Sequence, residues 1–181
     1  MPPNRPDRER EEKIEEILDA AEAQLLAGGY SAMSVAAIAR RLRIAANTIY
    51  WYFPSKDRLL VAVLDRLMRR VVERKPPHAA GLVRQALYFV DQLAEFRAAL
   101  LALRERAGQS QEVADFEAHF RFGVRTMLTS GLQAELPARE AVAAAEAFGA
   151  TVEGALALNL PKKERDRVLT LVLRRLMSGA G

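Results

Sequence analysis

Four aromatic residues stand side by side at Tyr50–Phe53, directly before Pro54, Ser55 and Lys56. The chain has 12 aromatic residues among its 181 (seven Phe, four Tyr and one Trp), so a third of them lie in this short stretch. Serine after proline is a typical helix-start signal, and a lysine follows it at once. Hydroxyl, indole and ammonium groups gathered at a helix start could contact a partner, whereas core packing is the simpler explanation for the rings.

The composition excludes several classes of protein. Half of the residues are hydrophobic and 28% are charged, so the chain should fold rather than stay disordered. It contains no cysteine, which excludes disulfides and thiolate metal sites and fits a reducing compartment. The polar start "MPPNRPDREREEK" is unlike a secretion signal, and no apolar run approaches the roughly 18 residues of a membrane-spanning helix. We therefore expect a cytoplasmic protein without a membrane partner.

The net charge is only +4, but it is unevenly distributed along the chain. Residues 7–22 contain eight acidic and three basic side chains, which gives a local net charge of −5. Residues 40–75 contain ten basic and three acidic side chains, which gives +7. This segregation indicates an anionic partner near the middle of the N-terminal half, although a solvated helix face would produce it equally well.

Hydrophobic periodicity predicts four helices in the N-terminal part of the chain. The first should stop at Gly28-Gly29, where glycine can take the left-handed C-cap conformation. The second should begin at a Ser34 N-cap, and the third should span about residues 46–51. The fourth should begin at a Ser55 N-cap and end before Pro76-Pro77, because the residue before proline avoids the helical region.

Five further helices are expected after the two prolines, and no segment alternates with the period of a strand. Their expected ranges are about 79–93, 95–106, 109–132, 138–158 and 162–177. We therefore predict an all-α fold of about nine helices, with an N-terminal three-helix helix-turn-helix domain and a C-terminal helical bundle. The expected division is a flexible tail at 1–8, the helix-turn-helix domain at 9–67 and the helical bundle at 68–181.

The segment "GGYSAMSVAAIARRLRIAANTIYWYFPSKDRLLVAVLD" resembles the N-terminal domain of TetR/AcrR-family transcriptional regulators. The aromatic run followed by Phe-Pro-Ser-Lys is its most specific part, and the resemblance covers about residues 11–67. The rest of the chain is similar only in being helical, as the family's effector domains are. The resemblance implies a ligand-responsive DNA-binding repressor that binds a pseudo-palindromic operator as a homodimer and is released by a small, largely apolar effector.

The resemblance also implies roles for residues near the turn. Tyr50 falls where the family presents a hydroxyl to a DNA phosphate, and Lys56 falls where it has a phosphate-contacting lysine. Thr48 occupies the place of a residue that meets base edges, and Phe53 should anchor the helix to the core. The full set of expected DNA-binding residues is Ser34, Arg40, Arg41, Arg43, Asn47, Thr48, Tyr50, Trp51, Tyr52 and Lys56.

The sequence departs from the family pattern at the turn and in the recognition helix. Arg43 stands where the turn usually carries glycine, and a left-handed arginine there would cost about 1 kcal/mol. Ala45 replaces a common serine cap, whose loss typically costs about 1 kcal/mol. Asn47 replaces a frequent glycine and could pair with adenine. Few long side chains are then available for reading bases, so DNA shape should contribute to specificity.

The last two expected helices have the features of an oligomer interface. The segment "DRVLTLVLRRLM" carries apolar residues on more than one stripe, and the helix before it is rich in Ala and Gly, which permits close helix approach. Such helices pair the subunits of TetR-family dimers, although a monomer core would explain the pattern too. The expected interface residues are Val142, Ala145, Phe148, Gly149, Val152, Val168, Leu169, Val172 and Leu176.

Large apolar residues gather in the middle helices, where the family encloses a small-molecule pocket, although plain core packing is the simpler explanation. The expected pocket residues are Tyr88, Phe89, Phe96, Phe116, His119, Phe120, Met127 and Phe148. Asp115 and His119 are spaced i, i+4 and Glu112 lies one turn earlier, but a metal would need a further converging ligand. We expect a hydrogen-bonded histidine near the pocket, and no metal or other cofactor.

No catalytic constellation accompanies these features. The sequence contains no nucleophile elbow, no glycine-rich phosphate loop and no clustered His and Asp, so we expect no enzymatic activity. A helical scaffold that binds only other proteins is the alternative to a DNA-binding regulator. The positive window and the aromatic-Pro-Ser-Lys run favour the regulator, and specific retention on double-stranded DNA would distinguish the two.

Overall fold

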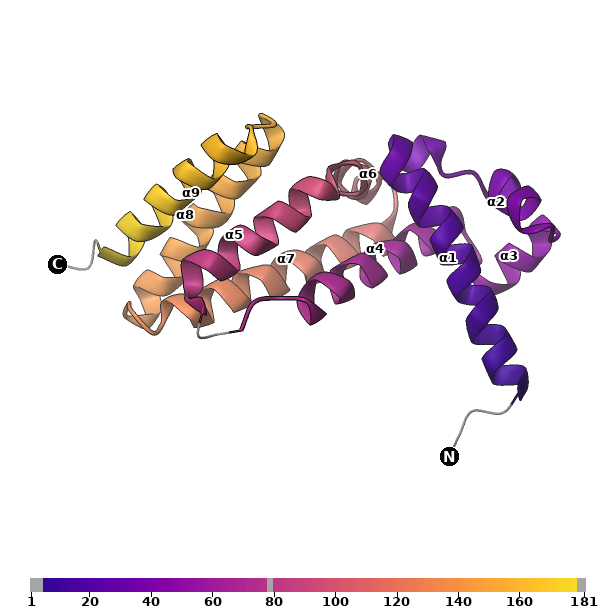
Figure 1. Cartoon of the computed structure of the whole chain (residues 1–181), viewed down its shortest axis with the longest axis horizontal. Coiled ribbons are helices and arrows are strands. Elements are labelled where there is room, and N and C mark those ends of the chain that lie inside the picture. The colour runs from indigo at the N-terminus through magenta and orange to yellow at the C-terminus, as the bar shows by residue number, and fades with distance from the viewer. Residues whose placement is uncertain (1–4, 78–79, 179–181) are drawn as a thin grey trace. The chain divides into compact units, whose positions relative to one another are not determined.

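The computed structural model describes residues 5–77 and 80–178, with side chains from residue 7 onward, and these residues form nine helices and no strand (Figure 1). The predicted all-α fold class is confirmed. Among the residues described, no helix is both long and apolar enough to cross a membrane. The helices are α1 (Arg5–Ala32), α2 (Val35–Leu42), α3 (Ala46–Tyr52), α4 (Lys56–Glu73), α5 (Leu82–Glu95), α6 (Arg97–Ala107), α7 (Gln111–Leu132), α8 (Ala138–Ala157) and α9 (Lys162–Ser178).

The chain forms two compact units. The first unit takes residues up to Arg70 together with Ala98–Glu117, and the second takes Val71–Arg97 together with the residues from Ala118 onward. This grouping differs from the expected division at residues 67/68, because α6 and the first turns of α7 join the N-terminal helices. Residues 5–8, expected in a flexible tail, begin α1, while residues 1–4 of that tail lie outside the described residues.

Helix boundaries in the first unit follow local sequence signals. The regular helix of α1 is interrupted at Gly28 and Gly29, as expected, but Gly29 takes φ 70° and ψ −164° rather than a left-handed helical conformation. A side chain at Gly28 would lie 2.6 Å from the Ala32 Cβ, so the kink needs glycine there. The Ser34 Oγ accepts a hydrogen bond from the Ala37 amide (3.3 Å), and the Ser55 Oγ accepts one from the Arg58 amide (2.9 Å). Both serines therefore cap as predicted.

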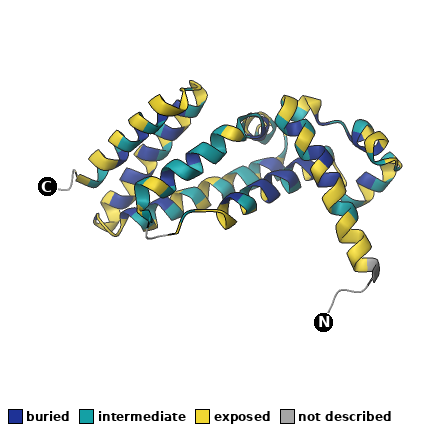
Figure 2. Cartoon of the chain, viewed as in Figure 1, coloured by how far each residue is buried: buried dark blue, intermediate teal, exposed yellow. Residues whose placement is uncertain are grey.

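The core of the first unit lies between α1, α2, α3 and α4, and Figure 2 shows their buried residues in dark blue. Helix α2 packs against both α1 and α3. The side chains that are fully buried there come from all four helices and from the segment between α1 and α2. The largest of them are Ile17, Leu25, Met33, Ile38, Ile49, Leu59, Leu60, Leu64 and Leu67. This core holds α2 and α3 as one rigid head.

The second unit buries a separate core between α5, the C-terminal part of α7, α8 and α9. Helix α9 packs against both α8 and α5. Arg165 of α9 is 7% exposed and donates to the Asp91 carboxylate of α5 (2.5 Å). The core residues are Ala86, Val90, Leu128, Leu132, Leu136, Ala141, Ala144, Ala145, Phe148, Val152, Leu169 and Leu173.

Candidate nucleic-acid interface

The turn between α2 and α3 closes through a left-handed arginine. Arg43 has φ 56° and ψ 41°, and its amide donates to the carbonyls of Ala39 and Arg40. The Ile44 amide also donates to the Ala39 carbonyl (3.0 Å), which ends α2 sharply. Helix α3 then begins after Ala45, whose extended backbone supplies no side-chain cap. The left-handed arginine and the missing cap are both as the sequence predicts.

The aromatic run divides between the core and the surface. Phe53 is buried, as expected, and Ile49 one turn earlier is buried as well. Tyr50 and Trp51 are 45% and 68% exposed, which is unusual for aromatic rings that have no binding partner. The Tyr52 ring meets the Trp51 ring edge-on, with centroids 4.8 Å apart. Helix α3 is therefore anchored by two buried side chains and presents two aromatic side chains to the outside.

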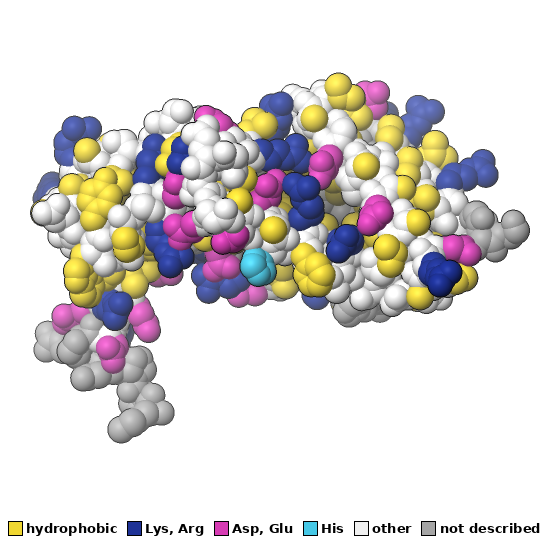
Figure 3. Space-filling view, turned by 180° about the vertical axis from the view of Figure 1, so that it is seen from behind, with side chains coloured by type: hydrophobic (Ala, Val, Ile, Leu, Met, Phe, Trp, Pro, Cys, Tyr) yellow, Lys and Arg dark blue, Asp and Glu magenta, His cyan; other side chains and the backbone are white. Residues whose placement is uncertain are grey.

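Helices α2 and α3 carry positive charge and no negative charge. Residues 23–56 contain no Asp or Glu, so α2 and α3 have no acidic side chain. Arg40, Arg41 and Arg43 are exposed and have no carboxylate partner in the described part of the chain. At the end where α2 and α3 lie, Figure 3 shows dark-blue basic side chains among yellow apolar ones. Of the other predicted residues, Asn47 is exposed, and the remainder are partly exposed: Ser34, Thr48, Tyr52 and Lys56.

The positive window in the sequence separates into two groups. Four of its ten basic residues, all on α4, form ion pairs within the first unit, so the alternative of an ordinary charged helix face explains them. Arg58 pairs with Glu112, Arg69 with Asp65 (3.2 Å), Arg70 with Glu22 (2.5 Å), and Arg66 with three carboxylates. The arginines of α2 and the turn form the group that stays available.

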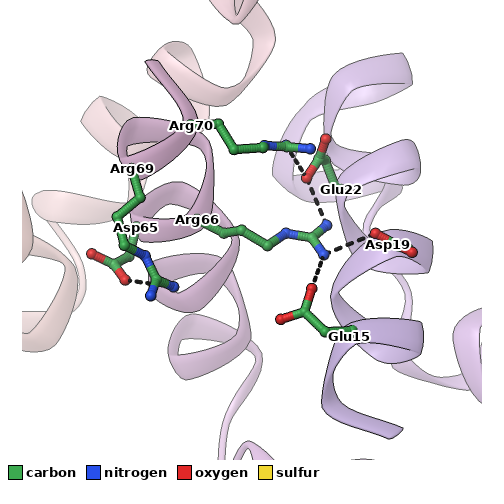
Figure 4. Close-up of polar contacts among 7 residues, drawn as sticks. All are labelled: Glu15, Asp19, Glu22, Asp65, Arg66, Arg69 and Arg70. Atoms are coloured by element: carbon green, nitrogen blue, oxygen red, sulfur yellow. Dashed lines mark hydrogen bonds and ion pairs between the residues drawn. The ribbon is translucent and has the colours of Figure 1, made fainter. Parts of the chain in front are cut away.

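Arg66 joins α4 to α1 through a network of ion pairs in which the arginine itself is buried (Figure 4). Its Nη1 lies 2.9 Å from Glu15 and 2.8 Å from Asp19, and its Nη2 lies 2.7 Å from Glu22. Burial opposes the charge of Arg66, but the three carboxylates outweigh burial and raise its pKa. Three of the eight acidic residues between positions 7 and 22 are therefore engaged with α4 inside the unit.

A second cluster surrounds Lys56 at the start of α4. The Lys56 Nζ lies 4.0 Å from the Tyr30 ring centroid, and the Arg106 guanidinium lies 4.7 Å from the same ring. The Tyr30 hydroxyl donates to the Asp57 Oδ1 (2.6 Å). Arg106 donates to both oxygens of Asp57, at 3.1 Å and 2.8 Å. The cluster connects the end of α1, the first turn of α4 and the last turn of α6.

The electrostatics of this cluster are set mainly by Asp57 and Arg106. The hydrogen bond from Arg106 lowers the pKa of Asp57 to about 2, and the Tyr30 hydroxyl adds to that shift. Burial, followed by the Asp57 hydrogen bond, raises the pKa of Tyr30 to about 12. Burial and the nearby Arg106 lower the pKa of Lys56. At neutral pH the cluster therefore holds an Asp57 anion against a neutral tyrosine.

No local pattern in the sequence points to this cluster. Tyr30 follows the glycine kink and Asp57 follows Lys56, but neither position suggests their contact. Arg106 lies 49 residues from Asp57, and no short-range signal links the two. Its helix was expected to belong to a different domain, so the pair could be found only in the fold.

The residues expected at a dimer interface have different environments. Ala145, Phe148, Val152 and Leu169 lie in the core of the second unit. Val142 is 43% exposed, and the remaining members (Gly149, Val168, Val172 and Leu176) are partly exposed. Two exposed leucines of the same region were not predicted, Leu158 after α8 and Leu171 on α9, at 76% and 59% exposure. Exposed apolar residues are thus present on these helices, with Val142 from the expected set and Leu158 and Leu171 beyond it.

The expected pocket residues are not all in one compact unit. Phe116 belongs to the first unit, and the other seven belong to the second. In the second unit Tyr88 donates to the Val71 carbonyl (3.1 Å) and meets Phe89 edge-on, with centroids 5.6 Å apart. Phe148 is buried in the core, His119 is exposed, and the others are partly exposed: Phe96, Phe120 and Met127.

Two acidic residues near His119 have polar partners on α4 and α7. Glu112 pairs with Arg58, and Asp115 accepts a hydrogen bond from the Gln111 side chain (2.8 Å). Over the residues that the structure describes, no three or more His, Asp or Glu side chains gather as metal ligands would.

The sequence matches to known proteins centre on the helix-turn-helix region. Residues 17–63 match the family described as "Bacterial regulatory proteins, tetR family". The chain is 41% identical over 80 residues to the HTH-type transcriptional repressor KstR of Rhodococcus jostii (strain RHA1), which covers 43% of this chain and 38% of the repressor. Matches to two further KstR repressors cover 29% and 27% of their lengths. The chain therefore spans about a third of the length of these relatives.

Solved structures share the fold over nearly the whole chain. A transcriptional regulator from Rhodococcus sp. RHA1 superposes with a TM-score of 0.78 at 20% identity, covering 92% of this chain and 96% of its own. A transcriptional regulator from Saccharomonospora viridis, in complex with choline, superposes with a TM-score of 0.75 at 17% identity, covering 91% and 96%. Residues 17–63 thus match the tetR family of bacterial regulatory proteins, in agreement with the turn and the exposed aromatics, and the chain as a whole shares the fold of solved transcriptional regulators.

Proposed function

We propose that the protein is a transcriptional repressor that binds a pseudo-palindromic operator in double-stranded DNA as a homodimer and is released by a small, largely apolar effector. One observation carries the proposal. Helices α2 and α3, which have no acidic side chain of their own, present unpaired arginines and two exposed aromatic rings. Such a surface suits the phosphate backbone, where affinity depends on positive charge.

Two kinds of DNA contact follow from the positions of the exposed residues. Tyr50 and Lys56 serve as phosphate contacts, and the helix start behind Ser55 offers its amides to the same phosphate. Arg40, Arg41 and Arg43 add charge around the turn. Asn47 and Thr48, near the start of α3, are the candidates for reading base edges in the major groove. The rings of Trp51 and Tyr52 reach the backbone at the end of the helix.

Selection of bound duplexes from a random-sequence pool tests the function directly. We expect enrichment of a pseudo-palindrome whose half-sites are centred about 34–36 Å, or a multiple of this, apart. The reason is that two recognition helices related by a two-fold axis must enter major grooves on one side of the duplex. Failure to enrich any sequence at both low and moderate salt would reject a sequence-specific regulator and favour a scaffold that binds protein.

Point variants separate the two kinds of contact on the selected duplex. Lys56→Ala and Tyr50→Phe should weaken binding to all sequences about equally, because phosphate contacts carry no sequence information. Asn47→Ala should relax the preference at one base position, at about 1–3 kcal/mol. Lys163→Ala, which removes an exposed lysine on α9, is the control for a general loss of charge. Equal effects of Lys56→Ala and Lys163→Ala would reject the phosphate assignment.

The effector proposal rests on the middle helices and on the family. A protein of the same fold holds choline, which supports the idea that this fold accommodates a small organic ligand. The aromatic residues between α5 and α7 favour a more apolar compound here. A thermal-shift screen of small apolar compounds should find one that stabilises the protein and lowers its DNA affinity. Compounds that stabilise it without any effect on DNA binding would contradict effector-controlled release.

The effector releases the protein from DNA by changing the spacing between the α2–α3 heads of the two subunits. Helix α4 has its residues up to Arg70 in the first unit and the rest in the second, so it belongs to both. A shift of α4 moves the head of one subunit relative to the head of the other. Two heads whose spacing no longer matches the half-sites cannot both dock. A hundredfold loss of affinity then needs about 2.7 kcal/mol of differential effector binding, which is within ordinary allosteric coupling.

A further inference from the structure

Arg10, on the first turns of α1, differs from the neighbouring basic residues of its helix. Arg8 pairs with Glu12 (3.1 Å) and Lys13 pairs with Glu16 (2.5 Å). Arg10 has no carboxylate partner in the described part of the chain, and its guanidinium carbon lies 5.4 Å from the centroid of the Trp51 ring. An exposed arginine of α1 is therefore held beside the recognition helix, 41 positions further along the chain.

The contact fixes Arg10 without using up its hydrogen-bond donors. A guanidinium that lies over an aromatic ring is held by its face, while its five N–H groups point outward in its own plane. The Trp51 ring is itself held edge-on by Tyr52, at 4.8 Å between centroids. The Arg10 guanidinium thus lies beside the Trp51 ring, which in turn contacts Tyr52, and it pairs with no carboxylate of the described residues.

We propose that Arg10 binds a DNA phosphate beside the end of α3, so that the nucleic-acid interface extends from α2 and α3 onto α1. The inference rests on the proposed function. Double-stranded DNA carries one charge per about 1.7 Å of helix axis, so a guanidinium next to a ring that meets the backbone has a phosphate within reach. The planar fork of arginine suits two phosphate oxygens at once.

Three carboxylates of α1 are turned toward α4, whereas Asp7, Glu9, Glu11 and Glu12 lie on the turns around Arg10, where Glu12 pairs with Arg8. Glu15, Asp19 and Glu22 are bound to Arg66, on the following turns of the helix. The N-terminal turns of α1 thus have a different role from the remainder of the helix. The N-terminal turns carry Arg10, which flanks the recognition helix, and the later turns bind Arg66 of α4.

The test compares Arg10→Ala with Arg8→Ala, two variants that remove the same charge from the same helix two residues apart. The probe is the duplex selected from the random pool, and the measurement is the dissociation constant at several salt concentrations. Arg10→Ala should make the slope of log K against log salt shallower by about 0.9 for each phosphate that the variant no longer neutralises. Arg8→Ala should leave the slope of the wild-type protein almost unchanged. Thermal unfolding of both variants checks that α1 stays folded.

A scan with single neutral methylphosphonates locates the phosphate that Arg10 binds. In each half-site one neutralised phosphate should weaken the wild-type protein and have no further effect on Arg10→Ala, while other positions weaken both equally. Equal slopes for the two variants, or a scan that shows no such position, would overturn the role of Arg10 while leaving DNA binding intact. Absence of any selected duplex would instead reject the proposed function itself.

Discussion

At Arg43 the backbone conformation favours glycine, whereas the proposed DNA contact favours a positively charged side chain. The residue adopts the left-handed conformation that costs a side chain roughly 1–2 kcal/mol and that glycine adopts freely. Its side chain is exposed, and no carboxylate in the described residues contacts it. Within the described residues, its side chain therefore forms no ion pair that would offset the strain. A positive charge beside the DNA backbone gives a reason to keep arginine at this position.

Replacing Arg43 by glycine separates its effect on stability from its effect on DNA binding. Arg43→Gly should raise the free energy of unfolding by up to about 1 kcal/mol, because the strain is removed, and it should weaken DNA binding. Arg41→Gly, in the last turn of α2, is the matched control, and it should lower the free energy of unfolding by about 1 kcal/mol. Chemical denaturation measures both. Equal destabilisation by the two substitutions would mean that the left-handed conformation carries no strain.

The Asp57 carboxylate gives a prediction about pH. Its pKa is lowered to about 2 from 3.8, so its contribution to stability is present above pH 3.8 and is lost as pH falls through about 2. Asp57→Asn should cost about 1 kcal/mol at pH 7, since the pair with Arg106 is partly open to solvent. The cost should shrink as the pH is lowered from 4 toward 2.

Asp65→Asn is the control for this prediction. It removes the same charge from the same helix, in an exposed pair with Arg69. Its effect on the free energy of unfolding should be within about 0.5 kcal/mol at every pH. A pH profile for Asp57→Asn that is parallel to that of Asp65→Asn would show that the hydrogen bonds of Asp57 contribute no stability.

At the scale of helices, the two charged windows of the sequence meet in part, because Arg66 and Arg70 of α4 pair with carboxylates of α1. The acidic run on α1 and the basic run on α4 meet at Arg66, which is 8% exposed. Arg66→Met should therefore lower the free energy of unfolding by about 2 kcal/mol, less than a fully buried pair because Glu15 and Asp19 are largely exposed. Arg69→Met removes a neighbouring exposed pair and should change stability by less than about 0.5 kcal/mol. Equal effects on urea unfolding would contradict a special role for Arg66.

The limits of individual helices could be predicted from sequence, because caps and breakers act over a few residues. The Ser34 and Ser55 caps, the interruption at Gly28-Gly29 and the left-handed Arg43 are all found in the structure. Helix α3 runs one residue beyond its expected end at residue 51. Ala79, the expected start of α5, lies outside the described residues, and the described helix begins at Leu82.

Contacts between distant helices could not be predicted in the same way. The basic window counted Arg66 and Arg43 alike, and only the packing of α4 on α1 separates a structural cation from an available one. The pair of Arg106 and Asp57 depends on α6 lying in the first unit. The exposed aromatics and the buried Phe53 could be assigned in advance because the local helical period fixes their opposite faces.

At the scale of the whole molecule, the division into two units changes which helices we expect an effector to act on. Helix α7, like α4, has residues in both units, since Gln111–Glu117 belong to the first and the rest to the second. The first unit, which carries the proposed DNA-binding surface, thus includes α6 and the start of α7, and Arg106 holds that part to Asp57. A fragment that ends at Lys75 would lack this ion pair, so experiments on DNA binding need the full chain.

The proposed homodimer gives a prediction at this scale. Leu171 is 59% exposed on α9, so Leu171→Glu should weaken dimerisation by placing a charge in an apolar interface. Leu101→Glu, at a leucine of α6 that is 52% exposed, is the matched control and should leave the dimer intact. Light scattering across a range of protein concentrations measures the mass. A wild-type protein that stays monomeric at high concentration would reject the dimer itself.

Trp51 is the single tryptophan of the chain and is 68% exposed, so the protein carries its own fluorophore on the surface assigned to DNA. Its emission in the free protein should be red-shifted, as for an indole in water. Docking should shift or quench that emission, and no other residue contributes an indole signal. Stopped-flow fluorescence of the unlabelled protein can therefore measure the rate of operator binding from the emission of Trp51 alone.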